Sequence, residues 1–237
     1  MSAARAPALR DARVGDLLPA PVRAATAPLD ADLSNLFDAE RSAVERAIPR
    51  RQREFASGRR CARTLLAELG HPPVAIPRSA DRTPAWPAGI VGSISHCDDL
   101  CFVAVAPASA LAGLGVDVEP DQPLETALWR RICTPDELAG VVAASPTALR
   151  GHTVRLLFSA KEAFYKSVFP LLREVLGFQA VEIDVDWATG RFRCGVDEAL
   201  RARLPGGRTP EGRFLHRDGW VFTAATLSAT PLEARSS

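Results

Sequence analysis

The chain has 237 residues and a formal net charge of +1, with 47% hydrophobic and 24% charged residues, as is ordinary for a soluble globular protein. This length suits one large domain or two small ones, and the near-neutral charge does not favour a nucleic-acid or membrane-surface binder. We therefore expect no nucleic-acid partner. No apolar run reaches the roughly 18 residues of a membrane helix, so we expect no membrane contact. The start of the chain shows no secretory signal pattern, and we expect a cytoplasmic location.

The first half predicts helices followed by strands. Residues 1–30 are rich in Pro and Ala, and we expect part of them to form a loosely packed arm, although their Arg-rich start leaves an organelle transit peptide as an alternative. A helix is predicted from about Ser34 or Asp38 to Ala47, and Pro49 suits the first turn of a second helix over 49–70. The prolines of 80–89 indicate a loop.

Strands and helices alternate in the middle of the chain. GIVGSISHCDDLCFVAVAP predicts two short strands around a polar turn, and ALAGLGVDVEP predicts a strand that ends at Pro120. A helical region near 124–132 precedes TPDEL, where Thr134 is a predicted N-cap. Ser159 is the predicted N-cap of a further helix over 159–169.

The last sixty residues predict two hairpins. They are VEIDVDW–ATG–RFRCGV and GRFLHRDGWVFTAATL, the second with Asp218-Gly219 as its turn. Helices and antiparallel strands therefore occur in both halves, which predicts an α+β fold. No sequence repeat with a period of 20–50 residues is visible.

Two carboxylates in GVDVE are candidate metal ligands. Asp117 and Glu119 are two residues apart, so a strand places both side chains on one face. Carboxylates held close repel unless a cation lies between them, and oxygen ligands suit Mg²⁺, with Mn²⁺ possible. Glu162 is a candidate third ligand. Charged strand ends are common, which leaves a solvated strand edge as the alternative.

The chain has only two lysines among its 29 Lys and Arg residues, and both flank Glu162 in FSAKEAFYK. Glu162 and Lys166 are four residues apart and share a helix face, which alone predicts only a surface ion pair. Lysine offers a compact, rotatable charge where the rest of the chain uses arginine. We therefore predict that Lys161 and Lys166 contact a phosphate near the metal.

A basic stripe follows the predicted helix 49–70. Arg51, Phe55, Arg59 and Arg63 recur every four residues and share one face. The stripe is either a solvated basic face or an anion site, and Arg78 in the following loop is a further candidate.

Ser95 and His96 in GSISHC form a second candidate group. A lone His is usually structural, but beside a hydroxyl it can also donate to a phosphate. A Ser–His hydrolase is disfavoured because there is no GxSxG motif and adjacent strand residues point to opposite faces. Cys97 and Cys101 beside His96 lack a fourth zinc ligand. Since the five cysteines are odd in number and form no CxxC motif, we expect reduced, buried thiols.

Together these segments resemble the 4′-phosphopantetheinyl transferases of the larger monomeric type, the branch of enterobactin synthetase component D and the surfactin-type activators. The segments are RRQREFASGRRCAR (50–63), TPAWPAGIVGSISHC (83–97), GVDVE (115–119) and FSAKEAFYKSVFP (158–170). GxDxE followed some forty residues later by FSAKExxYK is the specific part. The resemblance implies a monomeric pseudo-dimer of two similar α+β halves, 1–110 and 111–237, with the active site in the cleft between them.

The resemblance also implies an activity and its partners. The enzyme would transfer 4′-phosphopantetheine from coenzyme A to a serine of an apo acyl or peptidyl carrier protein, releasing adenosine 3′,5′-bisphosphate. The carrier would belong to a polyketide, non-ribosomal peptide or fatty-acid synthase, as in secondary-metabolite or siderophore biosynthesis. The alternatives are a Mg²⁺-dependent phosphodiesterase or nuclease, and a non-catalytic module that binds coenzyme A or another nucleotide.

Carried over by motif, the resemblance implies a role for each candidate residue. Asp117, Glu119 and Glu162 would hold Mg²⁺, and Glu162, Lys166 and Asp117 would form the catalytic group, with Glu162 as the general base. Lys161 and Lys166 would contact the phosphates. The adenosine-side phosphates would be bound by a larger set, Arg51, Arg59, Arg78, Ser95 and His96, with Arg63 as a weaker candidate.

Overall fold

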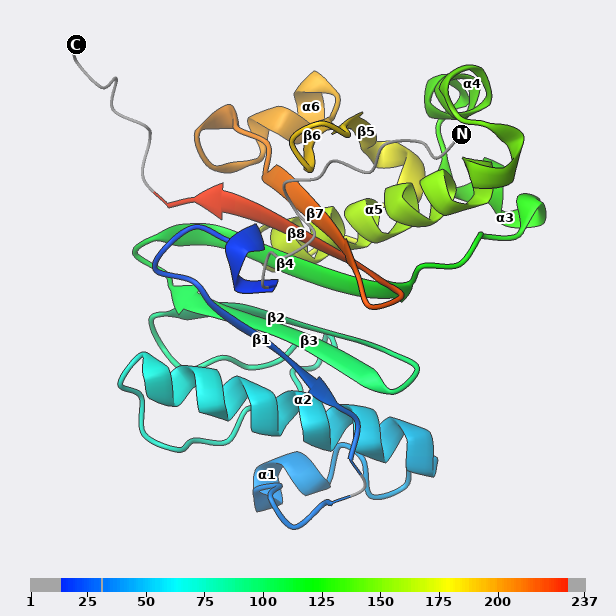
Figure 1. The fold of residues 1–237 in the computed structure, drawn as a ribbon. Helices are drawn as coiled ribbons and strands as arrows, with labels where there is room; N and C mark the ends of the chain where they lie inside the picture. The colour runs from blue at the N-terminus through cyan, green and yellow to red at the C-terminus, as the bar shows by residue number, and fades with distance from the viewer. Residues whose placement is uncertain (1–13, 31, 230–237) are drawn as a thin grey trace.

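The computed structural model describes residues 14–30 and 32–229, and within them two antiparallel sheets lie between two long helices (Figure 1). The first sheet has the order β1-β3-β2, from β1 (Arg23–Pro28), β2 (Ile90–Cys97) and β3 (Leu100–Pro107). Helix α2 (Pro49–Glu68) covers its outer face through apolar side chains that include Leu65. The short helix α1 (Asp38–Arg41) precedes α2.

The second sheet is built from the C-terminal part of the chain. Its order is β4-β8-β7-β6-β5, from β4 (Leu111–Pro120), β5 (Glu182–Asp186), β6 (Arg191–Gly195), β7 (Glu211–Arg217) and β8 (Trp220–Ser228). Helix α5 (Arg150–Leu172) covers its outer face. The remaining helices are α3 (Thr126–Ile132), α4 (Pro135–Ala144) and α6 (Glu198–Ala202), with 3₁₀ turns η2 (Val14–Leu17), η3 (Thr147–Leu149), η4 (Phe178–Ala180) and η5 (Pro205–Gly207).

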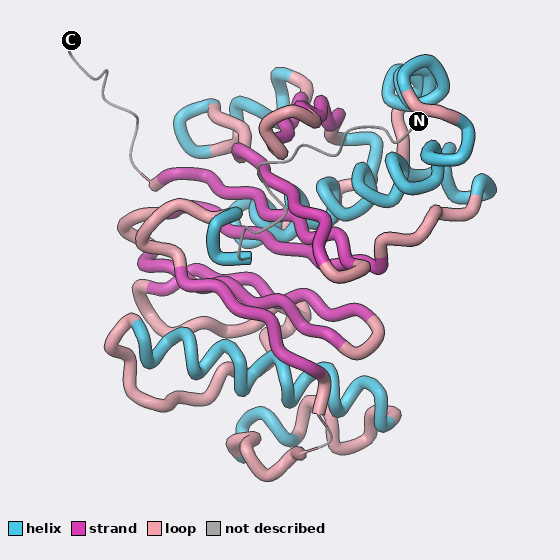
Figure 2. The backbone as a smooth tube through the Cα atoms, in the orientation of Figure 1, coloured by secondary structure: helices cyan, strands magenta, loops and turns pink. Residues whose placement is uncertain are grey.

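The inner faces of the two sheets pack against each other, as the two tiers of strands in Figure 2 show. This core contains Phe102 of β3, Val116 of β4 and Phe222 of β8. Outer cores lie under α2 and under α5, so the order of layers is helix, sheet, sheet, helix. The predicted α+β fold is confirmed. Among the described helices, none is both long and apolar enough to cross a membrane.

The local predictions that depend on adjacent residues are confirmed. Strands β5 and β6 pair, as do β7 and β8, and Asp218 and Gly219 take φ values of 52° and 81°. Positive φ at both central residues is typical of a type I′ hairpin turn. Thr134 caps α4, since its hydroxyl accepts from the Glu137 amide while the Glu137 carboxylate accepts from the Thr134 amide.

Three predicted segments are corrected. The prediction of a loose arm is wrong for residues 14–30, because β1 pairs with β3 along its length and Leu17 is buried. Residues 1–13 lie outside the described residues. The helix predicted from Ser34 or Asp38 to Ala47 begins at Asp38, the second of the two predicted starts, but it is helical only to Arg41 and continues as turns. The helix predicted over 159–169 begins nine residues earlier, at Arg150, so Ser159 is an interior residue of α5 and not its N-cap.

Two glycines of β4 set how closely α5 lies on the sheet. A Cβ added to Gly115 would lie 1.9 Å from the carbonyl oxygen of Ala163, and one added to Gly113 would lie 2.4 Å from that of Ser167. Both oxygens belong to the α5 backbone. The glycine of GVDVE therefore allows α5 to approach β4 directly, next to Asp117.

Candidate active site

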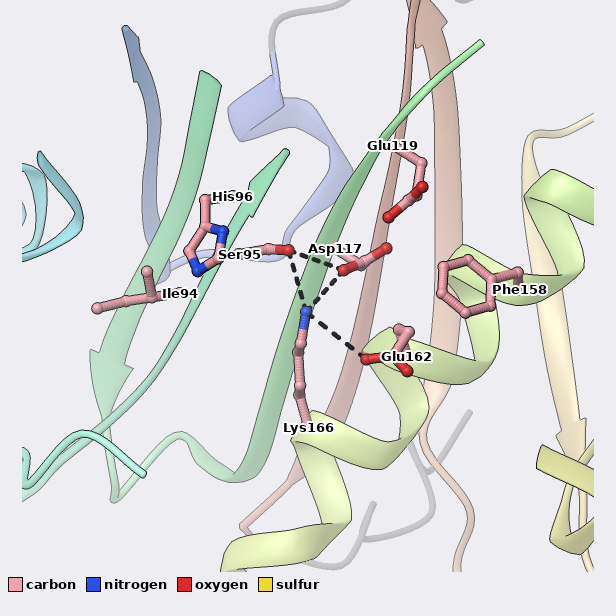
Figure 3. A pocket seen from close by; sticks show the side chains of 8 residues that line it. All are labelled: Ile94, Ser95, His96, Asp117, Glu119, Phe158, Glu162 and Lys166. Atoms are coloured by element: carbon pink, nitrogen blue, oxygen red, sulfur yellow. Dashed lines mark hydrogen bonds and ion pairs between the residues drawn. The ribbon is translucent and has the colours of Figure 1, made fainter. Parts of the chain in front are cut away.

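A pocket of about 270 Å³ lies where the two sheets and α5 meet (Figure 3). Strand β2 comes from the first sheet, and β4 and α5 come from the C-terminal part. The lining residues are Ile94, Ser95, His96, Asp117, Glu119, Phe158, Glu162 and Lys166. A wider cavity of about 930 Å³ runs along β5, β6 and the 207–212 segment, and it contains none of the predicted site residues.

The serines of SISHC bring β2 close to β4. Ser93 and Ser95 are two apart and share a face of the strand. The Ser93 hydroxyl accepts from the Val116 amide at 3.0 Å, and the Ser95 hydroxyl donates to Asp117 Oδ1 at 2.7 Å. These two hydrogen bonds join the two sheets, and the second of them lies in the pocket lining.

Asp117 is the centre of the pocket and is only 3% exposed. Besides Ser95, Lys166 Nζ donates to its Oδ1 at 2.6 Å, and the Ser159 hydroxyl donates to its Oδ2 at 2.8 Å. Donors from β2 and from two turns of α5 thus fix this carboxylate.

Lys166 is the cation of the pocket. Its Nζ also donates to Ser95 Oγ at 3.0 Å and lies 4.0 Å from Glu162 Oε2 (Figure 3). Its side chain remains partly exposed, as does that of Glu162. Both groups are therefore accessible to a bound molecule.

Burial disfavours the charged forms of Glu119 and Glu162. Burial and, secondarily, the charge of Asp117 raise the pKa of Glu119 to about 7, although Arg155 Nη1 donates to Glu119 Oε2 at 2.7 Å. Burial also raises the pKa of Glu162, against the attraction of Lys166. Each carboxylate would be stabilised in its charged form by a further cation in the pocket.

The predicted metal ligands all face this pocket. No group of three or more His, Cys, Asp or Glu side chains within 14–30 and 32–229 is already arranged to hold a metal. Lys166 donates to Asp117 Oδ1, and Arg155 donates to Glu119 Oε2. The chemistry of Asp117, Glu119 and Glu162 nevertheless fits a hard divalent cation. All the donors are oxygens, as a hard divalent cation prefers. Burial raises the pKa values of Glu119 and Glu162, so a bound cation would favour their charged forms.

The raised pKa of Glu119 predicts a pH-dependent stability. A carboxyl group with a folded-state pKa near 7 and an ordinary value of 4.5 binds more protons in the folded state between those pH values. Its stabilising contribution is therefore complete below about pH 4.5 and is lost as the pH rises through 7. In EDTA, we expect the melting temperature of the wild type to fall relative to that of Glu119→Gln between pH 5 and pH 8.

Thermal unfolding of both proteins across this range measures the difference. Addition of Mg²⁺ at pH 8 is expected to recover the stability of the wild type more than that of the variant. A difference in melting temperature between the two proteins that stays the same at all pH values would contradict the raised pKa of Glu119.

Lys161 is not in the pocket, and its predicted phosphate contact is wrong. Its side chain is 1% exposed, and Nζ donates to Glu137 Oε2 at 2.7 Å and to the carbonyl oxygens of Ile132 and Phe178 at 2.9 Å. All three donor positions of the ammonium group are used. Lys161 instead joins α5 to α3, α4 and η4.

Loss of Lys161 is accordingly expected to destabilise the fold. Lys161→Met leaves Glu137 as a buried charge without its cation, which typically costs about 3–5 kcal/mol. Denaturant unfolding measures this loss. Glu137→Gln introduced into the Lys161→Met protein is expected to recover part of it, and a single variant as stable as the wild type would disprove the structural role.

The predicted arginines gather on the N-terminal side of the pocket. Arg51 Nη1 lies 2.8 Å from His96 Nε2 and 3.1 Å from Glu54 Oε2, so Arg51 contacts the pocket lining. Burial lowers the pKa of His96, while Glu54 opposes the shift. Arg78 is exposed in the loop after α2, where it forms an isolated bridge with Pro84.

Arg59 and Arg63 are more enclosed. Arg59 is 5% exposed, its Nε donates to the Ile76 carbonyl oxygen at 2.6 Å, and its guanidinium stacks on Phe55. Burial, and next the nearby arginines 51, 63 and 78, lower the pKa of Arg59 to about 10, against Glu40. Arg63 forms an ion pair with the fully buried Glu40 at 2.7 Å. The structure thus brings the predicted arginines together, but only Arg51 touches a residue of the pocket.

Sequence reasoning missed Arg155, Phe158, Ser159 and Thr223. Arg155 lies two turns before Glu162 on α5, at the spacing that shares a helix face. That spacing would have predicted it, had the helix been extended back to Arg150. The sequence pattern predicts Ser159 only as a helix cap, and Thr223 has no local signal because its partner lies 64 residues away.

Two family models match the chain. A family model described as the 4′-phosphopantetheinyl transferase N-terminal domain matches residues 39–106, and one described as the 4′-phosphopantetheinyl transferase superfamily matches 113–204. The second matched segment contains GVDVE and FSAKEAFYK. Among solved structures, the holo-ACP-synthase from Plasmodium yoelii is 17% identical with a TM-score of 0.41, over 51% of this chain and 97% of that one.

Several relatives align over most of their length. The chain is 38% identical over 214 residues to 4′-phosphopantetheinyl transferase Svp of Streptomyces mobaraensis, covering 88% of this chain and 85% of that protein. It is 37% identical to the transferase Npt of Nocardia iowensis, over 78% of this chain and 86% of the relative. The transferase PptT of Mycobacterium tuberculosis is also 37% identical, over 78% and 82%. On this identity and coverage, the chain belongs to the 4′-phosphopantetheinyl transferase family.

Proposed function

We propose that the pocket between the two sheets transfers 4′-phosphopantetheine from coenzyme A to a serine hydroxyl of a carrier protein. The observation that carries the proposal is the meeting of Asp117, Glu119, Glu162 and Lys166 in one pocket of a chain from this family. The comparisons favour this activity over the phosphodiesterase and over a non-catalytic binding module, since the named relatives are transferases.

In the proposed reaction the serine oxygen bonds to the β-phosphorus, and the bond from that phosphorus to the bridging oxygen breaks. The electron pair leaves with adenosine 3′,5′-bisphosphate. Lys166, a partly exposed cation, stabilises the charge that develops on the leaving oxygen. Bound by Asp117, Glu119 and Glu162, a divalent cation would supply further positive charge at the pyrophosphate.

Glu162 is proposed to take the serine proton, directly or through a water molecule. It lines the pocket and is partly exposed, so a bound hydroxyl can reach it. Burial raises its pKa, which favours proton uptake by a general base.

A group of five residues is proposed to bind the adenosine-side phosphates: Arg51, Arg59, Arg78, Ser95 and His96. Arg51 and Arg78 are exposed, and His96 and Ser95 line the pocket beside Arg51. Arg59 is buried, and its Nε donates to the Ile76 carbonyl oxygen. Its proposed role is to present its two NH₂ groups to the phosphate and to hold the neighbouring arginines in place.

Further proposals follow the family resemblance. The cation is Mg²⁺ or Mn²⁺, and the halves divide near residue 110. The carrier is an acyl or peptidyl carrier of a polyketide, non-ribosomal peptide or fatty-acid synthase. We propose a monomer that acts in the cytoplasm.

The test is the intact mass of an apo-carrier protein after incubation with the protein, coenzyme A and Mg²⁺. A gain of about 340 Da, the covalent addition of one phosphopantetheine group, is expected. It should be lost in EDTA and in Asp117→Ala. Cleavage of coenzyme A without any gain in carrier mass would instead favour the phosphodiesterase, and binding without cleavage would favour the binding module.

A further inference from the structure

Two buried hydroxyl groups lie behind Asp117, outside the pocket lining. Ser159 of α5 and Thr223 of β8 are both 0% exposed. Thr223 is directly opposite Asp117 in the register of β4 and β8, and α5 places Ser159 against both. The three residues thus come from three different elements that meet at the site.

The distances connect these groups into one chain of hydrogen bonds. The Ser159 hydroxyl lies 2.8 Å from Asp117 Oδ2 and 2.9 Å from Thr223 Oγ1. Thr223 Oγ1 also lies 2.9 Å from the carbonyl oxygen of Ser159. All of these contacts are within ordinary hydrogen-bond range.

Counting protons assigns the donor and the acceptor in each of these hydrogen bonds. Each hydroxyl has one proton to donate, and an ionised carboxylate can only accept. Ser159 therefore donates to Asp117 Oδ2, and the single Thr223 proton is shared between the Ser159 hydroxyl and carbonyl oxygens, each 2.9 Å away, as a three-centre hydrogen bond. The Thr223 proton thus keeps the Ser159 proton aimed at Asp117.

We infer that Ser159 and Thr223 are positioning residues for Asp117. The buried hydroxyl chain from Thr223 through Ser159 holds Oδ2, and this orients Oδ1 towards Ser95 and Lys166 at the pocket. The inference rests on the proposed function, in which Asp117 helps to hold the cation and to place Lys166.

Another buried serine of the same helix shows what a purely structural hydroxyl looks like. Ser167 is also 0% exposed on α5, but its hydroxyl donates to the Phe164 carbonyl oxygen of its own helix at 2.7 Å. Ser167→Ala is therefore a matched control. It removes a buried hydroxyl from α5 without changing any contact of Asp117.

The experiment compares Ser159→Ala, Thr223→Val and Ser167→Ala. Mn²⁺ binding is measured by electron paramagnetic resonance without coenzyme A or carrier, and kcat and KM are measured for transfer. We expect the Mn²⁺ dissociation constant to rise about tenfold in the first two variants, with kcat falling by about tenfold or more and KM for coenzyme A within about twofold. Ser167→Ala should match the wild type in all three quantities.

Thr223→Ser tests the hydroxyl apart from the methyl group. It keeps the donor and should restore Mn²⁺ binding and kcat to within about threefold of the wild type, even where the lost methyl lowers the melting temperature. If Ser159→Ala does not fold, the comparison of Thr223→Ser with Thr223→Val tests the inference in its place.

Two results would overturn the inference. The first is wild-type Mn²⁺ affinity and kcat in both Ser159→Ala and Thr223→Val. The second is equal losses in Thr223→Ser and Thr223→Val, which would assign the effect to packing. Failure of the proposed function gives a different pattern, in which the wild type itself transfers nothing, and Mn²⁺ affinity then decides the inference alone. If the wild type transfers but binds no Mn²⁺, the kcat comparison decides it.

Discussion

The Asp117→Asn substitution is expected to lower the rate of phosphopantetheine transfer by about a thousandfold while the fold persists. The side chain keeps its shape, but an NH₂ group replaces one oxygen and accepts no hydrogen bond. Ser95 and Lys166 donate to Oδ1, and Ser159 donates to Oδ2, so either orientation of the amide opposes a donor. Lys166 also loses the negative charge that holds it. Initial rates of carrier mass gain at saturating coenzyme A measure the effect.

Asp184→Asn provides the control for this substitution. Asp184 is exposed on the edge strand β5, outside the pocket, and the chemical change is the same. Its transfer rate is expected to stay within about twofold of the wild type. An Asp117→Asn protein that melts like the wild type and keeps more than about a tenth of its rate would remove Asp117 from the catalytic group.

Short-range chemistry made much of the fold predictable from sequence. The turn at Asp218-Gly219 and the cap at Thr134 each depend on residues within a few positions, and both are present. Strand β1 was missed because RAATAP has no strong apolar alternation. Its pairing with β3, more than seventy residues away, makes it a strand.

Part of the site was predictable because its spacing is short. Residues two apart on a strand and four apart on a helix share a face, and the structure brings Asp117, Glu119, Glu162 and Lys166 to one pocket. The same geometry argues against Lys161. At about 100° per residue, five positions separate Lys161 and Lys166 by about 140° around the helix, so the two lysines face different surroundings.

The supporting residues could not be read from local spacing. Ser159 meets Asp117 across 42 positions of the chain, and Arg155 meets Glu119 across 36. A hydroxyl or guanidinium in a helix has several possible partners until the tertiary fold selects one. For Ser159 the N-cap interpretation was chemically reasonable, but α5 continues through it and its hydroxyl serves a strand.

Gly115→Ala is expected to destabilise the protein by at least about 3 kcal/mol and to disrupt the site. The added methyl would lie 1.9 Å from the Ala163 carbonyl oxygen and 2.7 Å from the Ser167 amide nitrogen, both backbone atoms of α5. A flexible side chain could turn away from such a contact, but these atoms move only with the helix. Helix α5 carries Glu162 and Lys166, so its displacement would separate them from Asp117. Denaturant unfolding and transfer rate measure the two effects.

Gly140→Ala is the matched control because the same methyl group would meet no atom within 4 Å on α4. Alanine is the better helix former, so this variant is expected to gain about 0.5–1 kcal/mol and to keep its transfer rate. Because the two substitutions are expected to change the free energy of unfolding in opposite directions, they distinguish the effect of close packing at Gly115 from the general effect of replacing glycine with alanine. A Gly115→Ala protein that unfolds at the wild-type denaturant concentration would mean that α5 does not rest on β4 in solution. Gly115 would then be required for contact with the bound substrate and not for the packing of α5.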